Sequence, residues 1–106
     1  MGMGIRVEFC TNWSYGGSVK NFVAEIAGFE DQFPALLAAF NLPDDSRGGG
    51  CRGEFCPSNH PKDMEALRAF CSAQGKPDDG GETVSQWMLR ICEAANLLGC
   101  NVVFEE

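Results

Sequence analysis

The two ends of this chain each carry a short segment in which apolar and polar residues alternate. One covers residues 5–9 and the other covers residues 100–104. A period of two is typical of a half-buried β-strand. Two short strands form an unstable sheet on their own. Either they pair with each other under the helices, or a central loop adds a third strand, or another subunit completes the sheet, as in a homodimer.

Between these segments, apolar residues recur at helical spacing. The first stretch follows Gly16-Gly17-Ser18, where Ser18 could cap a helix running from about Val19 to Ala27. Its apolar positions are Val19, Phe22, Val23, Ile26 and Phe29. Pro34 suits the first turn of a second, shorter helix that Pro43 closes.

Two longer helices are predicted in the second half of the chain. Pro61 begins the first of them and Gly75 ends it. The second carries the strongest apolar stripe of the chain, at Val84, Trp87, Met88, Ile91, Ala95 and Leu98. Thr83 and Gln86 have the spacing of a capping box before it, and Gly99 follows it where a left-handed residue is favoured.

The predicted order is therefore strand, four helices, strand, which is a small α+β fold. A length of 106 residues fits one domain spanning residues 1–106, and 44% hydrophobic with 22% charged residues is close to the globular average. Residues 44–60 are rich in Gly, Pro and polar residues and predict a long loop. A third short strand is expected within it at residues 53–55.

The charge of the chain restricts its partners. Fifteen acids and eight bases give a net charge of −7, which opposes binding to the phosphates of nucleic acids. No apolar stretch is long enough to cross a bilayer, so no membrane span is expected. The start of the sequence lacks the pattern of a secretory signal, which predicts a cytoplasmic setting with the six cysteines reduced.

Acidic loops and two aromatic residues in a polar segment predict a partner-binding surface. Trp13 and Tyr15 lie among Asn, Ser and Gly, and aromatic residues are frequent anchors at interfaces. The acidic rim is predicted at Asp44, Asp45, Asp78, Asp79 and Glu82. The expected partner is a protein with a basic surface. The alternative is that the acids only keep the chain dispersed and that Trp13 packs on its own core.

These features favour a non-catalytic interaction protein, such as an inhibitor or adaptor. Small acidic proteins encoded by phages and mobile elements, including inhibitors of host defence complexes that bind nucleic acids, have this type of composition. Cys56 and His60 could in principle form a nucleophile and its base, but nothing in the sequence supplies an orienting third group. No catalytic residues and no cofactor are therefore predicted.

A zinc site is an alternative interpretation of the central loop. Its only plausible ligand set is Cys51, Cys56, His60 and Cys71. Zinc favours four such ligands in a tetrahedron, but the spacing here departs from the usual short gaps between paired cysteines. Cys71 also falls on an apolar helical stripe, where a buried thiol is ordinary packing. The sequence therefore predicts no structural metal.

The N-terminal third of the chain resembles the selenoprotein W-like redox family. In that family the first strand ends in a Cys-x-x-Cys or Cys-x-x-selenocysteine motif before a helix. The similar residues run from Ile5 to Cys10, then through Tyr15 to Phe33-Pro34. Cys10 takes the place of the first redox residue, whereas Trp13 stands where the second would be. The resemblance implies a thiol-redox protein, and the missing second thiol departs from the family pattern.

Overall fold

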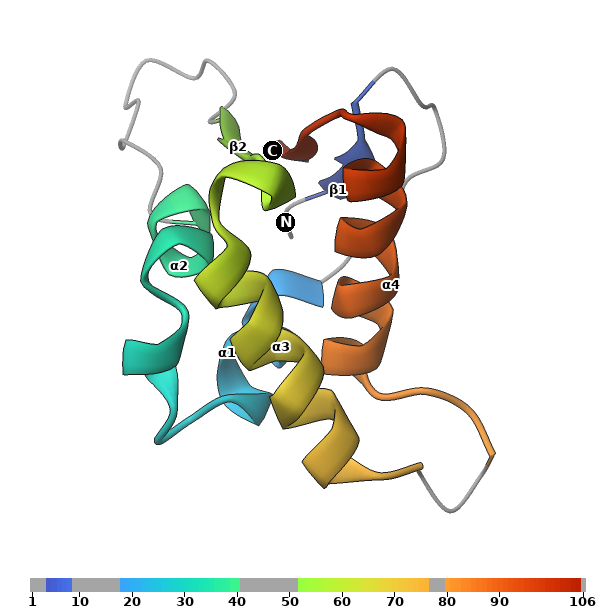
Figure 1. Ribbon diagram of the computed structural model, residues 1–106. Coiled ribbons are helices and arrows are strands. Elements are labelled where there is room, and N and C mark those ends of the chain that lie inside the picture. The colour runs from blue at the N-terminus through green and yellow to red at the C-terminus, as the bar shows by residue number, and fades with distance from the viewer. Residues whose placement is uncertain (1–3, 9–17, 41–51, 77–79, 106) are drawn as a thin grey trace.

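The structure is a computed structural model that describes residues 4–8, 18–40, 52–76 and 80–105 (Figure 1). The helices are α1 (Ser18–Glu25), α2 (Pro34–Phe40), α3 (Pro61–Gln74) and α4 (Val84–Leu98), with short 3-10 helices η1 (Glu30–Gln32) and η2 (Pro57–Asn59). The strands are β1 (Gly4–Val7), β2 (Arg52–Phe55) and β3 (Val102–Glu105). Figure 1 shows α3 and α4 in front, with the strands at the upper end of the molecule. The predicted α+β class is confirmed.

The three strands form one antiparallel sheet in which β3 lies in the centre, between β1 and β2. Ile5 of β1 lies opposite Phe104, and Phe55 of β2 lies opposite Val102. All four side chains are buried. The terminal strands therefore pair with each other as predicted, and the central loop contributes a third strand that includes the expected residues 53–55.

A row of six phenylalanine rings runs through the core towards one surface. Successive pairs meet edge to face, which is a favourable geometry for aromatic rings. From the sheet outwards the pairs are Phe104–Phe40, Phe40–Phe22, Phe22–Phe33, Phe33–Phe70 and Phe70–Phe29, with ring centroids 4.8, 5.9, 6.1, 6.2 and 5.5 Å apart. Phe104 is fully buried, whereas 46% of Phe29 is exposed. The aromatic core therefore reaches the solvent at Phe29.

The start of α2 is capped from another helix. Pro34 has no N–H, so the first free donors of this helix belong to Ala35 and Leu36. Both donate to Oδ2 of Asp63 at 3.0 Å. Asp63 belongs to the first turn of α3 and is almost completely buried. One carboxylate thus satisfies the end of α2 and holds it against α3.

Both predicted ends of α4 are confirmed. Thr83 accepts a hydrogen bond from the backbone N–H of Gln86, whose side chain accepts one from the N–H of Thr83, so the capping box is complete. Gly99 ends the helix with φ of 68°, in the left-handed region that glycine tolerates. Local sequence signals therefore determine both ends.

The apolar faces of α1 and α4 differ in detail from the predicted stripes. Helix α1 ends at Glu25, two residues early, and the chain then turns through Gly28, which has φ of 92°. Phe29 follows this turn and leaves the predicted helical face. In α4 the fully buried line includes Cys92, while Leu98, predicted to be buried, is 65% exposed in the last turn. The inner face of α4 is rotated because this helix packs against both α1 and α3.

Candidate functional site

Most of the predicted partner-binding residues fall outside the part of the chain that the structure describes. These are Trp13, Tyr15, Asp44, Asp45, Asp78 and Asp79. Glu82 is described, and its Oε1 lies 2.6 Å from Nη2 of Arg90. Its carboxylate also raises the pKa of Arg90 through that hydrogen bond and its charge. The charge of Glu82 is thus paired within the chain, and its role in an acidic rim stays a prediction.

The described members of the candidate zinc set do not converge. Cys56 Sγ lies 3.2 Å from Ser58 Oγ, and the His60 ring stacks on Phe55 with centroids 5.4 Å apart. Cys71 is buried on the inner face of α3. Across the described residues, no three His, Cys, Asp or Glu side chains form a group that could hold a metal ion. Cys51 lies outside the described residues, so the full set of four stays untested.

Two of the described thiols are in surroundings that disfavour thiol chemistry. Burial, together with the charges of Glu25 and Glu93, raises the pKa of Cys71 to about 11. Burial and the charge of Glu93 raise the pKa of Cys92 to about 12. A nucleophilic or redox-active cysteine needs a populated thiolate, which these surroundings suppress. Cys71 and Cys92 therefore act as core residues.

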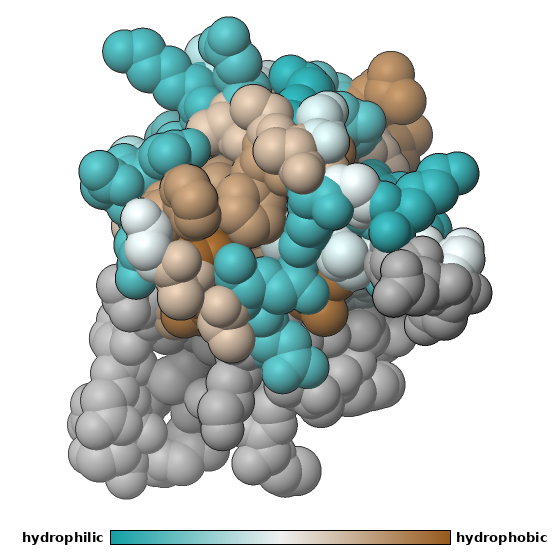
Figure 2. Space-filling view, turned by 90° about the horizontal axis from the view of Figure 1, so that it is seen from below, coloured by the Kyte–Doolittle hydropathy of each residue, from teal (hydrophilic) through white to brown (hydrophobic). Residues whose placement is uncertain are grey.

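The most distinctive surface of the described chain is an apolar groove between η1 and the second half of α3. The groove has a volume of about 340 Å³ and is lined by Phe29, Gln32, Ala69, Phe70, Ala73 and Gln74. Figure 2 shows brown, apolar side chains gathered on this face with teal, hydrophilic side chains around them. The ring of Phe29 forms its exposed wall. We call this surface the Phe29 groove.

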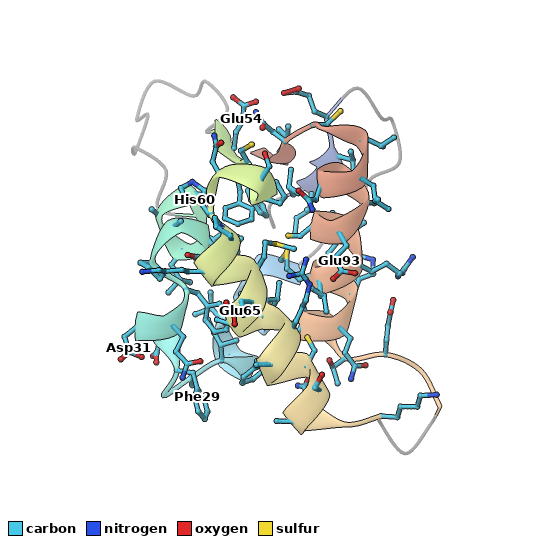
Figure 3. The ribbon with its side chains drawn as sticks, in the orientation of Figure 1. Phe29, Asp31, Glu54, His60, Glu65 and Glu93 are labelled. Carbon is cyan, nitrogen blue, oxygen red and sulfur yellow. The ribbon has the colours of Figure 1, made fainter. Side chains whose placement is uncertain are left out.

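Acidic side chains border the Phe29 groove on the η1 side. Glu30 and Asp31 follow Phe29 directly and are exposed. Glu30 accepts a hydrogen bond from the backbone N–H of Gly28 at 2.6 Å, and this bond fixes the turn that presents Phe29. Figure 3 shows Asp31 and Phe29 at the same corner of the molecule, with Glu65 above them on α3. The η1 segment beside the groove is therefore negatively charged.

Beside the groove lies a polar junction where α1, α3 and α4 meet. Glu25, the last residue of α1, accepts hydrogen bonds from the backbone N–H groups of Val84 and Ser85 at 3.2 and 3.0 Å. It also accepts bonds from the Ser85 hydroxyl at 2.6 Å and from Nε2 of Gln74 at 3.0 Å. Burial opposes the charge of Glu25, but these donors outweigh it and lower its pKa. The Glu25 junction therefore caps α4 with a carboxylate from α1.

Gln74 belongs to both the junction and the groove. Its Nε2 donates to Glu25, and its Oε1 accepts from the Thr83 hydroxyl at 2.7 Å. The amide that borders the groove therefore has both of its polar ends occupied inside the protein. The groove offers a ligand mainly apolar contacts.

A second hollow, of about 300 Å³, lies where η2, α3 and α4 meet. Its lining is Pro57, Ser58, Pro61, Met64, Arg68 and Asn96. Arg68 is paired with Glu93, with Nε and Oε1 2.7 Å apart. This hollow presents no cluster of groups with an evident chemical task.

Sequence reasoning missed the groove and the junction. The helical periodicity places Phe29 on the apolar stripe of the first helix and Phe70 on that of the third, and it makes no prediction for Ala69, Ala73 or Gln74. One signal was present, because Glu25 places an acid at the C-terminal end of a helix, where the helix dipole favours cations. Such a local conflict often marks a long-range role.

Comparisons with protein-family models, curated proteins and solved structures found no match to this chain. Within the described residues, none of the helices has the length and apolar character needed to cross a membrane.

Proposed function

We propose that this chain is a non-catalytic protein-binding module, of the inhibitor or adaptor type, that docks on a basic protein surface. The observation that carries the proposal is the Phe29 groove. It leaves an aromatic ring 46% exposed at the end of an otherwise buried row of rings. Exposed aromatic residues beside an apolar hollow are typical anchors of protein interfaces.

The charge distribution supports a basic partner. The chain carries a net charge of −7, and acids border the groove at Glu30 and Asp31. Two of the described cations, Arg68 and Arg90, are already paired with Glu93 and Glu82. Long-range attraction would therefore favour a positively charged surface and speed its encounter with the groove. The predicted anchors Trp13 and Tyr15 and the aspartates of the predicted acidic rim lie outside the described residues, and their part in binding stays a prediction.

The proposal is tested by capturing proteins from an extract of the native host on the immobilised chain. Phe29→Ser removes the exposed wall, and Ala69→Gln places a long neutral side chain on the floor of the groove. The original chain should capture basic proteins, and we expect the captured amount to fall by about tenfold with each of the two variants.

Matched controls distinguish a specific effect at the groove from a general change in non-specific binding. Leu97→Ser removes an apolar side chain that is 88% exposed near the C-terminal end of α4. Ser72→Gln makes the same kind of addition to α3 at an exposed residue outside the groove lining. Both controls should retain capture. Equal capture by the groove variants and the controls, with folding verified by circular dichroism, would reject the proposal.

A further inference from the structure

We infer that the Phe29 groove receives an amphipathic α-helix whose apolar face is flanked by Lys or Arg on the edge that faces η1. The inference rests on the proposed function and specifies the kind of partner. Three observations carry it: the shape of the groove floor, the small number of free hydrogen-bonding groups, and the charge of one wall.

The floor of the groove runs along α3. Ala69 and Ala73 are four residues apart, so they lie on the same face of this helix, and both are exposed. Their small side chains allow another helix to approach α3 closely. Phe29 and Phe70 form the aromatic wall beside that floor. A helix lying along α3 would place an apolar side chain against these rings.

Hydrogen bonding favours a helix over an extended segment. A buried backbone N–H or C=O without a partner costs free energy, so an extended ligand needs donors and acceptors from its site. At Ala69 and Phe70 the groove is lined by the interior of α3, where the backbone is paired within the helix, and both polar ends of Gln74 are engaged inside the protein. Among the lining side chains, the Gln32 amide and the second N–H of the Gln74 amide remain for a ligand. A helical ligand satisfies its own backbone and avoids this cost.

The charged groups around the groove determine which edge of the bound helix should carry basic residues. Glu30 and Asp31 make the η1 wall acidic, and Glu65 adds a negative charge on α3. Lys62 lies in the first turn of α3 and Lys76 follows the end of that helix by two residues, and neither lines the groove. Lys or Arg on the partner edge facing η1 would therefore be favoured. The same acids would repel the anionic surface of a membrane.

The test is a selection from a display library of random peptides of about 16 residues, a length at which an isolated helix can form. Peptides are selected on the original chain in the presence of excess soluble Ala69→Gln variant, which removes peptides that bind elsewhere. We expect the enriched peptides to carry apolar residues at i, i+3 or i+4, and i+7, with Lys or Arg along one edge. Their helicity should rise on binding, as measured by circular dichroism.

Binding by an enriched peptide should weaken by about tenfold with Ala69→Gln and stay unchanged with Ser72→Gln. Asp31→Asn should weaken peptide binding by about threefold, and the remaining binding should depend less on salt. The control Glu54→Gln on β2 should leave peptide binding unchanged. Enrichment of proline-rich or strictly alternating peptides, or of none, would overturn the helical inference. A concentration-dependent dimer of the chain that Ala69→Gln abolishes would also overturn it, by identifying a second copy as the occupant.

The two proposals fail in different ways. If extended peptides are enriched and displace captured host proteins, the groove is a protein-binding site and only the helical inference is wrong. If the groove variants capture the same host proteins as the original chain, the proposed function itself is wrong.

Discussion

The Glu25 junction and the Phe29 groove are neighbours that share Gln74. The polar groups of the junction are paired inside the protein, whereas the apolar side chains of the groove are exposed to solvent. In the junction, each free N–H at the start of α4 is satisfied by a side chain, from Glu25 or Thr83. In the groove, apolar surface of Phe29 and two alanines is left in contact with water. The side chains of the junction hold three helices together, whereas those of the groove are accessible to a partner.

This difference predicts that stability and binding respond to different residues. Removing a group from the junction leaves backbone donors without partners and should destabilise the fold. Changing the floor of the groove alters no internal hydrogen bond and should affect the docking of a partner. Each variant is expected to change either the stability of the fold or the binding of a partner far more than the other.

The largest effect on stability is expected from Glu25→Ala. The substitution deprives Val84 and Ser85 of an acceptor for their N–H groups and removes the link between α1 and α4. Allowing for the partial exposure of Glu25, we expect the free energy of unfolding to fall by about 2 kcal/mol. Urea denaturation followed by circular dichroism measures it. A loss no greater than that for an exposed acid such as Glu65→Ala would show that the junction carries little stability.

Acid should weaken the same junction by a smaller amount. The pKa of Glu25 lies below its ordinary value of 4.5 in the folded protein, because its hydrogen-bond donors favour the charged form despite burial. The stability that it contributes is therefore complete above pH 4.5 and is lost as the pH falls through the folded pKa. The effect is smaller than that of Glu25→Ala because the protonated carboxyl still packs and forms some hydrogen bonds.

The Glu25→Gln variant isolates this contribution from the other acids of the chain. The difference in unfolding free energy between the original chain and Glu25→Gln should shrink as the pH falls below 4.5. Denaturation curves at several pH values measure this difference. Parallel pH profiles for the two proteins would contradict the role of the charged form.

Thr83→Ala tests the local half of the cap. Thr83 accepts the N–H of Gln86 at 3.1 Å, while Glu25 satisfies the two preceding donors. Because only one backbone bond loses its acceptor, we expect a loss of about 1 kcal/mol in unfolding free energy. Thr83→Ser, which keeps the hydroxyl, serves as the control and should stay close to the original chain. A loss equal to that of Glu25→Ala would contradict this ranking of the two caps.

The contrast between these two caps also explains what the sequence could predict. Thr83, Gln86 and Gly99 act within a few residues of one another, so their spacing was enough to predict the ends of α4. The alternation at the chain ends likewise predicted the pairing of β1 with β3. Glu25 reaches Ser85 across 60 positions of the sequence, and no local pattern encodes such a contact.

The groove could not be predicted from the sequence for a related reason. The periodicity assigned Phe29 to a buried stripe, but α1 ends at Glu25 and the turn at Gly28 sends this ring to the surface. The sequence around Ala69 and Ala73 shows only that they belong to a helix. Their role in the groove depends on the position of η1 beside α3. Packing between segments far apart in sequence creates the groove, whereas composition and spacing describe only one segment at a time.

The smallest effect on stability is expected from Ala69→Gln, the variant that should impair binding most directly. Ala69 is exposed on α3, and glutamine forms helices nearly as well as alanine, so the unfolding free energy should change by less than about 0.5 kcal/mol. The double variant Glu25→Ala/Ala69→Gln should then lose the sum of the two single losses, because neither substitution removes a partner of the other. Urea denaturation of all four proteins gives the coupling energy. A coupling above about 1 kcal/mol would show that the groove and the junction form one cooperative unit through Gln74, and that binding and stability do not depend on separate residues.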